Sequence, residues 1–164
     1  MPATTKSQHR LPCYPNLVPG LHLTDINQLW VADITYIRLP RQFLYLAAVL
    51  DAYSQRVIGW VLEEHIVVRL TLGALQMAVS TCSVKPELVH HFDRGIQYAC
   101  DRYTEVLRAH GIHISMSRKA NPYDNAQAES FIKTFKSEEI DLSEYQSKRE
   151  AQQCIGRFLE QVYN

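Results

Sequence analysis

The arrangement of apolar and polar residues predicts three strands in the first half of the chain. Residues 29–39 and 43–50 are rich in β-branched, aromatic and other apolar side chains, and a short segment containing Pro40 separates them. A third stretch of this kind, residues 56–62, follows a Ser-Gln turn. Because short turns join these consecutive strands, we expect them to form an antiparallel meander.

Beyond these strands the apolar spacing changes to the helical period of about 3.6 residues. The first predicted helix stops before Pro86 and carries on one face the apolar residues Leu72, Leu75, Val79 and Cys82. The chain then alternates between strand and helix. The further predicted elements are a strand over 88–92, a helix over 103–110 that is closed by Gly111, a strand over 112–116 and a last helix.

The last predicted helix follows Asp124 or Asn125, either of which can cap it. Its expected buried stripe consists of Ala128, Phe131, Ile132 and Phe135. A meander followed by alternating strands and helices predicts an α/β fold. We expect a five-stranded mixed sheet, in which the antiparallel meander is joined by two parallel strands and helices flank the faces.

Composition indicates one globular domain preceded by a tail. Four of the seven prolines fall within the first 19 positions, so residues 1–24 are expected to be a tail or linker. Residues 25–164 have the length of one domain. The longest apolar stretch, 43–50, is shorter than the roughly 20 residues of a membrane span, and the N-terminus has no signal-peptide pattern. We therefore expect a cytoplasmic protein without membrane contact.

Cysteine usage and charge narrow the possible functions. The four cysteines are far apart without a Cys-x-x-Cys pair, which favours reduced thiols over a zinc site. The 17 basic residues balance the 17 acidic ones, whereas a dedicated nucleic-acid binder is usually basic. Any DNA affinity is therefore expected to come from a local patch, a bound metal or a domain outside this chain.

Three acidic residues occupy positions that the stability of the fold alone would not favour for an acid. Asp33 interrupts an apolar strand, Asp93 ends the fourth strand, and Glu129 lies one turn into the last helix. Each also has a simple structural interpretation. The Asp33 carboxylate could accept a hydrogen bond from the nearby backbone or pair with Arg94. Asp93 could form a turn. Glu129 could be a solvated helix residue paired with Lys133.

Helix geometry favours a functional interpretation of the acidic residues. At about 100° per residue, Lys133 and Lys136 fall within roughly 40° of Glu129, on the side of the helix opposite its apolar stripe. Carboxylates are the ligands that Mg²⁺ prefers, and two such ions can activate an attacking oxygen and stabilise a leaving one. Nearby lysines would hold phosphates. Together these residues predict metal-dependent phosphoryl transfer.

Three segments resemble the DDE transposases of bacterial insertion sequences, a group whose core is similar to retroviral integrase. They read Trp-Val-Ala-Asp33-Ile-Thr-Tyr, Phe-Asp93-Arg-Gly-Ile-Gln-Tyr and Asn-Pro-Tyr-Asp-Asn-Ala-Gln-Ala-Glu129-Ser. The 35 residues between Asp93 and Glu129 match the spacing of the family's Asp, Asp-35-Glu motif. The segment around Asp51 is also typical of the group. Asp51 is not a metal ligand in that family, and we expect it to be structural.

The resemblance implies a ribonuclease H-like fold and a DDE polynucleotidyl transferase. In such an enzyme Asp33, Asp93 and Glu129 would bind two Mg²⁺ ions, with Mn²⁺ as a substitute. Water, and then a DNA 3′-hydroxyl, would attack a phosphodiester, so that the enzyme cleaves element ends and joins them to target DNA during transposition. Family members act as homo-oligomers.

The resemblance also implies which residues contact DNA. Lys133 and Lys136 match basic positions that contact DNA in integrase-like proteins, and the loop before the last helix supplies further contacts. The complete set of expected DNA contacts is Lys133, Lys136, Arg118, Lys119, Asn121, Tyr123 and Asn125.

Departures from the family pattern leave other functions open. Phe92 stands where the family usually has Ser before the second Asp. Ile96 replaces a common Ser, and Ala120 replaces a common Gly ahead of Asn121. The upstream DNA-recognition region of the family is not part of the sequence, which also stops inside a segment that usually continues, so we expect a core truncated at its C-terminus. One alternative is a catalytically inert ribonuclease H-like remnant that acts as a DNA-binding or oligomerisation module. Another is a nuclease acting on RNA hybrids or branched DNA.

Overall fold

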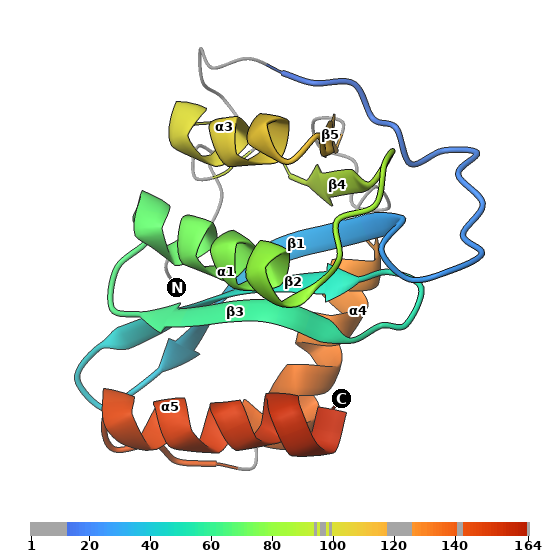
Figure 1. Cartoon of the computed structure of the whole chain (residues 1–164). Coiled ribbons are helices and arrows are strands. Elements are labelled where there is room, and N and C mark those ends of the chain that lie inside the picture. Colours follow the sequence, from blue (N-terminus) through green and yellow to red (C-terminus); the bar gives the residue numbers. More distant parts are fainter. Residues whose placement is uncertain are drawn as a thin grey trace.

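The computed structural model describes residues 13–93, 95, 98, 100–117, 126–140 and 143–163. A five-stranded sheet in the order β3-β2-β1-β4-β5 forms its centre, and helices lie against both faces (Figure 1). The strands are β1 (Leu29–Arg38), β2 (Phe43–Asp51), β3 (Val57–Glu63), β4 (Val89–Phe92) and β5 (His113–Met116). The helices are α1 (Val68–Thr81), α3 (Asp101–Ala109), α4 (Ala126–Phe135) and α5 (Lys148–Arg157), with π-helical turns η2 (Lys136–Ile140) and η3 (Phe158–Tyr163).

Strand pairing confirms the predicted mixed sheet. β1, β2 and β3 form an antiparallel meander, whereas β1 pairs with β4, and β4 with β5, in parallel. The observed strands begin and end within one residue of the predicted stretches. This agreement reflects the continuous apolar character of strands that are covered on both faces.

Alternate residues of β1 belong to two separate cores. Leu29, Val31 and Ile37 pack with α4 and α5 on one face of the sheet. Trp30 and Ala32 pack with α1 and α3 on the other face. Because successive strand residues point to opposite faces, this central strand must be apolar almost throughout. Asp33 is the one acidic residue within it.

The inner side of α4 confirms part of its predicted apolar stripe. Phe131 and Phe135 are buried and stack with ring centroids 5.8 Å apart, while Ile132 is partly buried against the same core. These contacts dock α4 against the sheet beside β1. Ala128 and the predicted caps Asp124 and Asn125 lie outside the part of the chain whose side chains are described.

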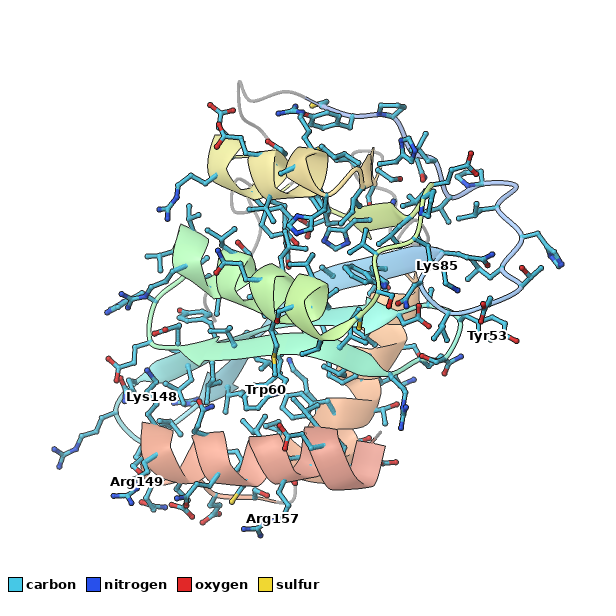
Figure 2. All side chains as sticks on the ribbon, in the orientation of Figure 1. Tyr53, Trp60, Lys85, Lys148, Arg149 and Arg157 are labelled. Atoms are coloured by element: carbon cyan, nitrogen blue, oxygen red, sulfur yellow. The ribbon has the colours of Figure 1, made fainter. Side chains whose placement is uncertain are left out.

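Helix α5 was not predicted, although the sequence contains a start signal for it. The Ser147 hydroxyl accepts a hydrogen bond from the Glu150 backbone N–H at 3.2 Å, and the Glu150 carboxylate accepts one from the Gln146 N–H at 3.0 Å. This arrangement resembles the capping box, in which Ser and Glu three residues apart satisfy backbone N–H groups at a helix start. Figure 2 shows Trp60 of β3 pointing toward α5, where Gly156 lies against its ring.

Other predictions concern the cysteines, the N-terminal segment and membrane contact. All four cysteines are free, as expected. Residues 13–18 run beside β5, where the Leu17 N–H donates to the Ser115 hydroxyl at 2.8 Å and the Met116 N–H donates to the Pro15 carbonyl at 3.4 Å. None of the described helices combines the length and apolar character that crossing a bilayer requires.

Candidate active site

The parallel pairing of β1 with β4 explains why Asp33 and Asp93 come together. In this ladder Val31 is paired with His91, and every pair differs by 60 positions. The same offset places Asp33 level with Asp93, two positions beyond the last paired residues. Both aspartates therefore lie at the carboxyl ends of adjacent parallel strands, where α/β sheets commonly bind ligands.

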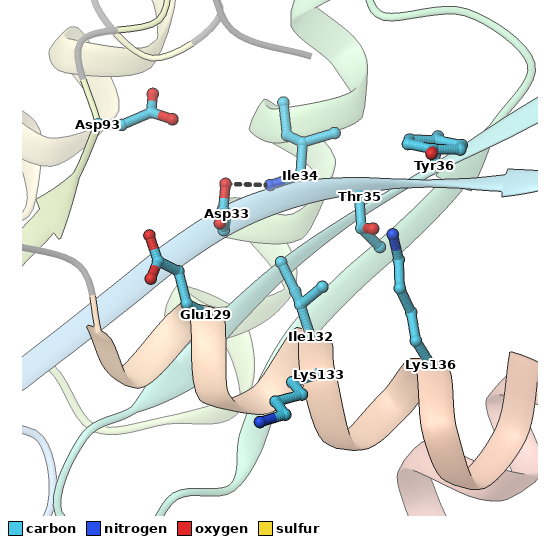
Figure 3. Close-up of a pocket in the computed structure, with 9 residues that line it drawn as sticks. All are labelled: Asp33, Ile34, Thr35, Tyr36, Asp93, Glu129, Ile132, Lys133 and Lys136. Atoms are coloured by element: carbon cyan, nitrogen blue, oxygen red, sulfur yellow. Dashed lines mark hydrogen bonds between the residues drawn. The ribbon is translucent and has the colours of Figure 1, made fainter. Parts of the chain in front are cut away.

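The third acid reaches this position from α4. A pocket of about 410 Å³ is lined by residues 33–36 of β1 and by Asp93. One side of α4 contributes Glu129, Ile132 and Lys133, and the start of η2 contributes Lys136. Figure 3 shows the Glu129 carboxylate extending from the first turn of α4 toward Asp33, with Asp93 beyond it. All three predicted acids thus line one pocket, although each comes from a different element.

Asp33 and Asp93 line the pocket and also form the local backbone hydrogen bonds that a purely structural role would predict. Asp33 Oδ1 accepts a hydrogen bond from the Ile34 N–H at 2.8 Å, and Asp93 Oδ1 accepts one from the Gly95 N–H at 2.9 Å. These bonds fix the direction of each carboxylate. Arg94, considered as a partner of Asp33, lies outside the described residues.

Glu129 matches only part of the structural role considered for it, that of a solvated helix residue paired with Lys133. Its side chain is exposed, as a solvated helix residue would be, yet no ion pair links it to Lys133 in the described part of the chain. Figure 3 shows the Lys133 amino group turned away from Glu129. The i to i+4 pairing considered for this residue is therefore not formed.

Burial and like charge dominate the electrostatics of Asp33. Removal of the carboxyl from water, together with the negative charges of Asp93 and Glu129, raises the pKa of Asp33 to about 7, against the lowering effect of the Ile34 N–H. Both neighbours are thus close enough to repel the ionised form of Asp33. A cation between the three acids would relieve that repulsion.

The chemistry of the donor set fits a hard divalent cation, since carboxylate oxygens are the ligands that Mg²⁺ prefers. The arrangement is nevertheless open. Across the described residues, no three His, Cys, Asp or Glu side chains are grouped closely enough to hold one ion.

Lys136 has a contact that its sequence position did not reveal. Its Nζ lies 4.6 Å from the centroid of the Tyr36 ring, which is the geometry of a cation–π interaction (Figure 3). Tyr36 in turn packs edge-on against Phe43. The lysine is therefore held at the rim of the pocket. The other expected DNA contacts Arg118, Lys119, Asn121, Tyr123 and Asn125 lie outside the described residues.

Asp51 is a structural residue, as expected. It is buried and accepts hydrogen bonds from the Asn27 N–H and from both the N–H and the hydroxyl of Ser54, each at 2.8 Å. In the β1–β2 ladder it lies opposite Trp30, three positions from Asp33. Its oxygens hold the end of β2 and are not directed to the pocket.

The unusual Phe92 belongs to an aromatic cluster beneath Asp93. Its ring is fully buried and contacts three neighbouring rings at centroid distances of 5.1 to 5.6 Å, those of His90, Tyr98 and Tyr103. Burial lowers the pKa of His90 to about 4, so that this imidazole is neutral. The substitution of Ser by Phe thus adds apolar packing and removes no acidic residue.

Comparison with known proteins yields matches over nearly the whole chain. The family model of the integrase core domain matches residues 24–122, and a second integrase core domain model matches residues 110–164. The chain is 39% identical over 163 residues to the insertion element IS600 31 kDa protein of Shigella sonnei, covering 99% of this chain and 60% of that protein.

Two named transposases are similarly related. The transposase for insertion sequence IS904 of Lactococcus lactis is 38% identical, with 92% of this chain and 60% of the transposase covered. Transposase InsF for IS3A of Escherichia coli is 36% identical, with 95% of this chain and 54% of that transposase covered. The chain therefore spans little more than half the length of these relatives.

Solved structures confirm the expected ribonuclease H-like fold. A chain of the simian T-cell lymphotropic virus intasome superposes with a TM-score of 0.68 at 16% identity, covering 96% of this chain and 56% of that one. The magnesium-bound catalytic core domain of HTLV-2 integrase superposes with a TM-score of 0.59 at 17% identity, covering 84% and 88%. With its family matches and its fold in agreement, the chain belongs to the integrase core domain family.

Proposed function

We propose that this chain is the catalytic core of an insertion-sequence transposase, a DDE polynucleotidyl transferase that cleaves DNA at element ends and transfers the strands to target DNA. The observation that carries the proposal is the convergence of Asp33, Asp93 and Glu129 on one pocket, with Lys133 and Lys136 beside them. The relatedness to the IS904 and IS3A transposases supports it. No observation favours the catalytically inert module.

In this proposal the three acids hold two Mg²⁺ ions, for which Mn²⁺ can substitute. When bound, such ions activate the attacking oxygen and stabilise the leaving oxygen of a phosphodiester. The solved HTLV-2 integrase core is a complex with magnesium, which agrees with a divalent ion in this fold. Because a carboxyl must be ionised to bind a cation, the raised pKa of Asp33 couples ion binding to proton release.

Each pocket residue has a separate task in this reaction. The Ile34 and Gly95 N–H groups orient the carboxylates of Asp33 and Asp93 through one oxygen each. Glu129 is carried by a helix and completes the set of acids from the opposite side of the pocket. Lys136, held over Tyr36, would contact a DNA phosphate at the rim.

The proposed partners are the element ends, the target DNA and further copies of this chain. Joining two ends to one target needs at least two active sites, so we propose a homo-oligomer acting in the bacterial cytoplasm. Residues 118–125 precede α4 in the sequence. We propose that Arg118, Lys119, Asn121, Tyr123 and Asn125 contact DNA near the pocket.

The test is divalent-ion-dependent nicking and strand transfer on a supercoiled plasmid carrying the element ends. Activity should require Mg²⁺ or Mn²⁺ and should be lost in Asp33→Asn, Asp93→Asn and Glu129→Gln. The matched control is Asp25→Asn, because Asp25 is exposed and paired with Lys85 outside the pocket. Nicking that persists in all three amide variants would refute the proposal.

The chain covers little more than half the length of its relatives, so we also propose a test of metal binding that does not depend on DNA cleavage. An ion that binds the folded state raises its melting temperature. Mn²⁺ should therefore stabilise the wild-type chain and the Asp25→Asn control, and should not stabilise Asp93→Asn. Equal melting temperatures with and without Mn²⁺ in the wild-type chain would contradict the metal site.

A further inference from the structure

A second hollow in the surface lies between the β1–β2 hairpin and the start of α5. Its volume is about 480 Å³, and its walls include residues 39–42 of the hairpin and residues 146–149. Three of the lining side chains are cationic, those of Arg41, Lys148 and Arg149. Figure 2 shows Lys148 and Arg149 together at one end of α5. The charge of these side chains indicates an anionic partner.

Nearby carboxylates neutralise only part of this charge. Lys148 is paired with Glu63, whose Oε2 lies 3.5 Å from the lysine Nζ. Glu64 is the one acidic residue that lines the hollow. Arg41 and Arg149 are exposed, and within the described part of the chain neither makes a hydrogen bond or an ion pair. The hollow therefore presents two unpaired guanidinium groups against one carboxylate.

The stability of the fold does not explain the position of Arg149. The residue lies in the first turn of α5, where the helix dipole places partial positive charge and disfavours a cation. An acid is favoured there, as at Glu150 in the same turn. Arg157, by contrast, lies in the last turn of α5, where a cation is favoured. A charge held at an unfavourable position is typical of a functional residue.

The open edge of β1 leads from the active-site pocket toward this hollow. β4 pairs with β1 only as far as Val31, and beyond that residue no described strand continues the sheet on this side of β1. Figure 3 shows Asp93 and Glu129 at one end of the pocket, and Tyr36 with Lys136 at the other. The second end lies in the direction in which β1 runs to the hairpin. The two hollows thus follow one another along β1.

Arg38 lies between the pocket and the hollow. It is exposed, and alternation along β1 places it on the same face as Tyr36, over whose ring Lys136 lies. The five positions from Asp33 to Arg38 span about 17 Å of strand. A DNA strand advances about 3.4 Å per nucleotide. DNA with its reacting phosphodiester in the pocket would therefore reach Arg38 after about five base pairs, and the hollow beyond it.

We propose that Arg38, Arg41 and Arg149 form a second DNA contact, which holds duplex phosphates on one side of the reacting bond. Guanidinium groups suit this task because they donate two parallel hydrogen bonds to a phosphate. DNA is favoured over an acidic protein segment because the arginines follow the strand edge that leads from the pocket. Phosphate contacts position a duplex without reading its bases. The inference rests on the proposed function, which places DNA in the pocket.

The experiment measures the affinity of the 164-residue chain for a duplex of about 24 base pairs, long enough to span both hollows. Fluorescence anisotropy in EDTA is recorded over a range of salt concentrations. Arg41→Gln and Arg149→Gln should each reduce the slope of log affinity against log salt by about 1, and the double variant by about 2. The matched control is Arg157→Gln, which removes the same charge from an exposed position of the same helix and should keep the wild-type slope.

The variants should remain folded, because neither arginine makes a hydrogen bond or ion pair in the described part of the chain; wild-type melting temperatures check this. A wild-type slope in the double variant would overturn the second contact and assign the hollow to another partner. An equal loss in Arg157→Gln would also overturn it, since net charge alone would then explain the effect. Lys136→Gln separates this inference from the proposed function. If Lys136→Gln lowers the slope and the double variant does not, only the second contact fails; if neither lowers it, DNA binding at the pocket fails as well.

Discussion

Asp33 occupies a position at which the sheet would otherwise be apolar. Its neighbours Ala32 and Ile34 are buried in the core on one face, and Val31 in the core on the other. One local hydrogen bond from Ile34 compensates only part of the cost of burying its charge. A residue that opposes stability in this way is typical of a functional site.

The stability of the ion-free protein should therefore depend on the ionisation of Asp33. Its pKa is raised from 3.8 to about 7, so the folded state binds the proton more tightly than the unfolded state. Stability is thus highest below the unfolded pKa and declines as pH rises toward the folded pKa. Relative to Asp33→Asn, the wild-type chain should lose about 2 to 3 kcal/mol between pH 5 and pH 8.

Urea denaturation of both proteins in EDTA at the two pH values measures this effect. The comparison with Asp33→Asn is needed because His90 works in the opposite direction. Its pKa is lowered to about 4, so its contribution to stability grows as pH rises from about 4 toward 6.5. A difference between the two proteins that is the same at pH 5 and pH 8 would contradict the assignment.

Lys136 should contribute to DNA affinity through charge. The logarithm of DNA affinity falls linearly with the logarithm of the salt concentration, and each phosphate contact by a lysine makes this fall steeper by about 1. Lys136→Gln should therefore bind duplex DNA more weakly and with a slope lower by about 1, as measured by fluorescence anisotropy. The control is Lys85→Gln, because Lys85 is paired with Asp25 at 2.7 Å outside the pocket. Equal slopes in Lys136→Gln and wild type would argue against a phosphate contact.

The strands and helices were predictable where the apolar pattern is continuous. The stretch 43–50 predicts a strand that the structure places at Phe43–Asp51, because a strand buried on both faces leaves a clear signal. Helix α5 has a weaker pattern, with Ala151 and Ile155 as its buried residues. Its start at Ser147 could have been predicted from the Ser and Glu three residues apart.

The cap of α5 should contribute measurably to stability. Ser147→Ala removes the hydroxyl that accepts the Glu150 N–H, which should lower the free energy of unfolding by about 1 kcal/mol. The matched control is Ser80→Ala in α1, where the hydroxyl donates to the Met77 carbonyl inside the helix and its loss should be close to neutral. Urea denaturation measures both variants, and equal effects would show that Ser147 does not act as a cap.

At the scale of the whole molecule, the fold brings together acids that are remote in the chain. Asp33 and Asp93 meet through the parallel β1–β4 pairing, and Glu129 is added by α4, which the buried Phe131 and Phe135 dock against the sheet. Such long-range placement leaves no periodic signal in the sequence. The three acids could be singled out by their positions and family motifs, but the register that aligns two of them needed the structure.

The remaining features of the site depend on packing that sequence patterns do not encode. The contact between Lys136 and Tyr36 arises from tertiary neighbours. The neutral net charge of these 164 residues gives no strong long-range attraction for DNA, so any DNA binding by this chain is expected to depend on local groups of charged residues. The three acids and the two lysines are nevertheless gathered in one pocket at the carboxyl ends of β1 and β4.

We propose that Asp33, Asp93 and Glu129 share divalent ions. The most direct measurement is a crystal structure of the chain in Mn²⁺, with the ion located by its anomalous scattering. We expect Mn²⁺ in the pocket, bound by oxygens of Asp33 and Asp93, with the Glu129 carboxylate drawn into the same site. A pocket without Mn²⁺, or a bound ion from which Glu129 is turned away, would show that the three acids do not form a shared metal site.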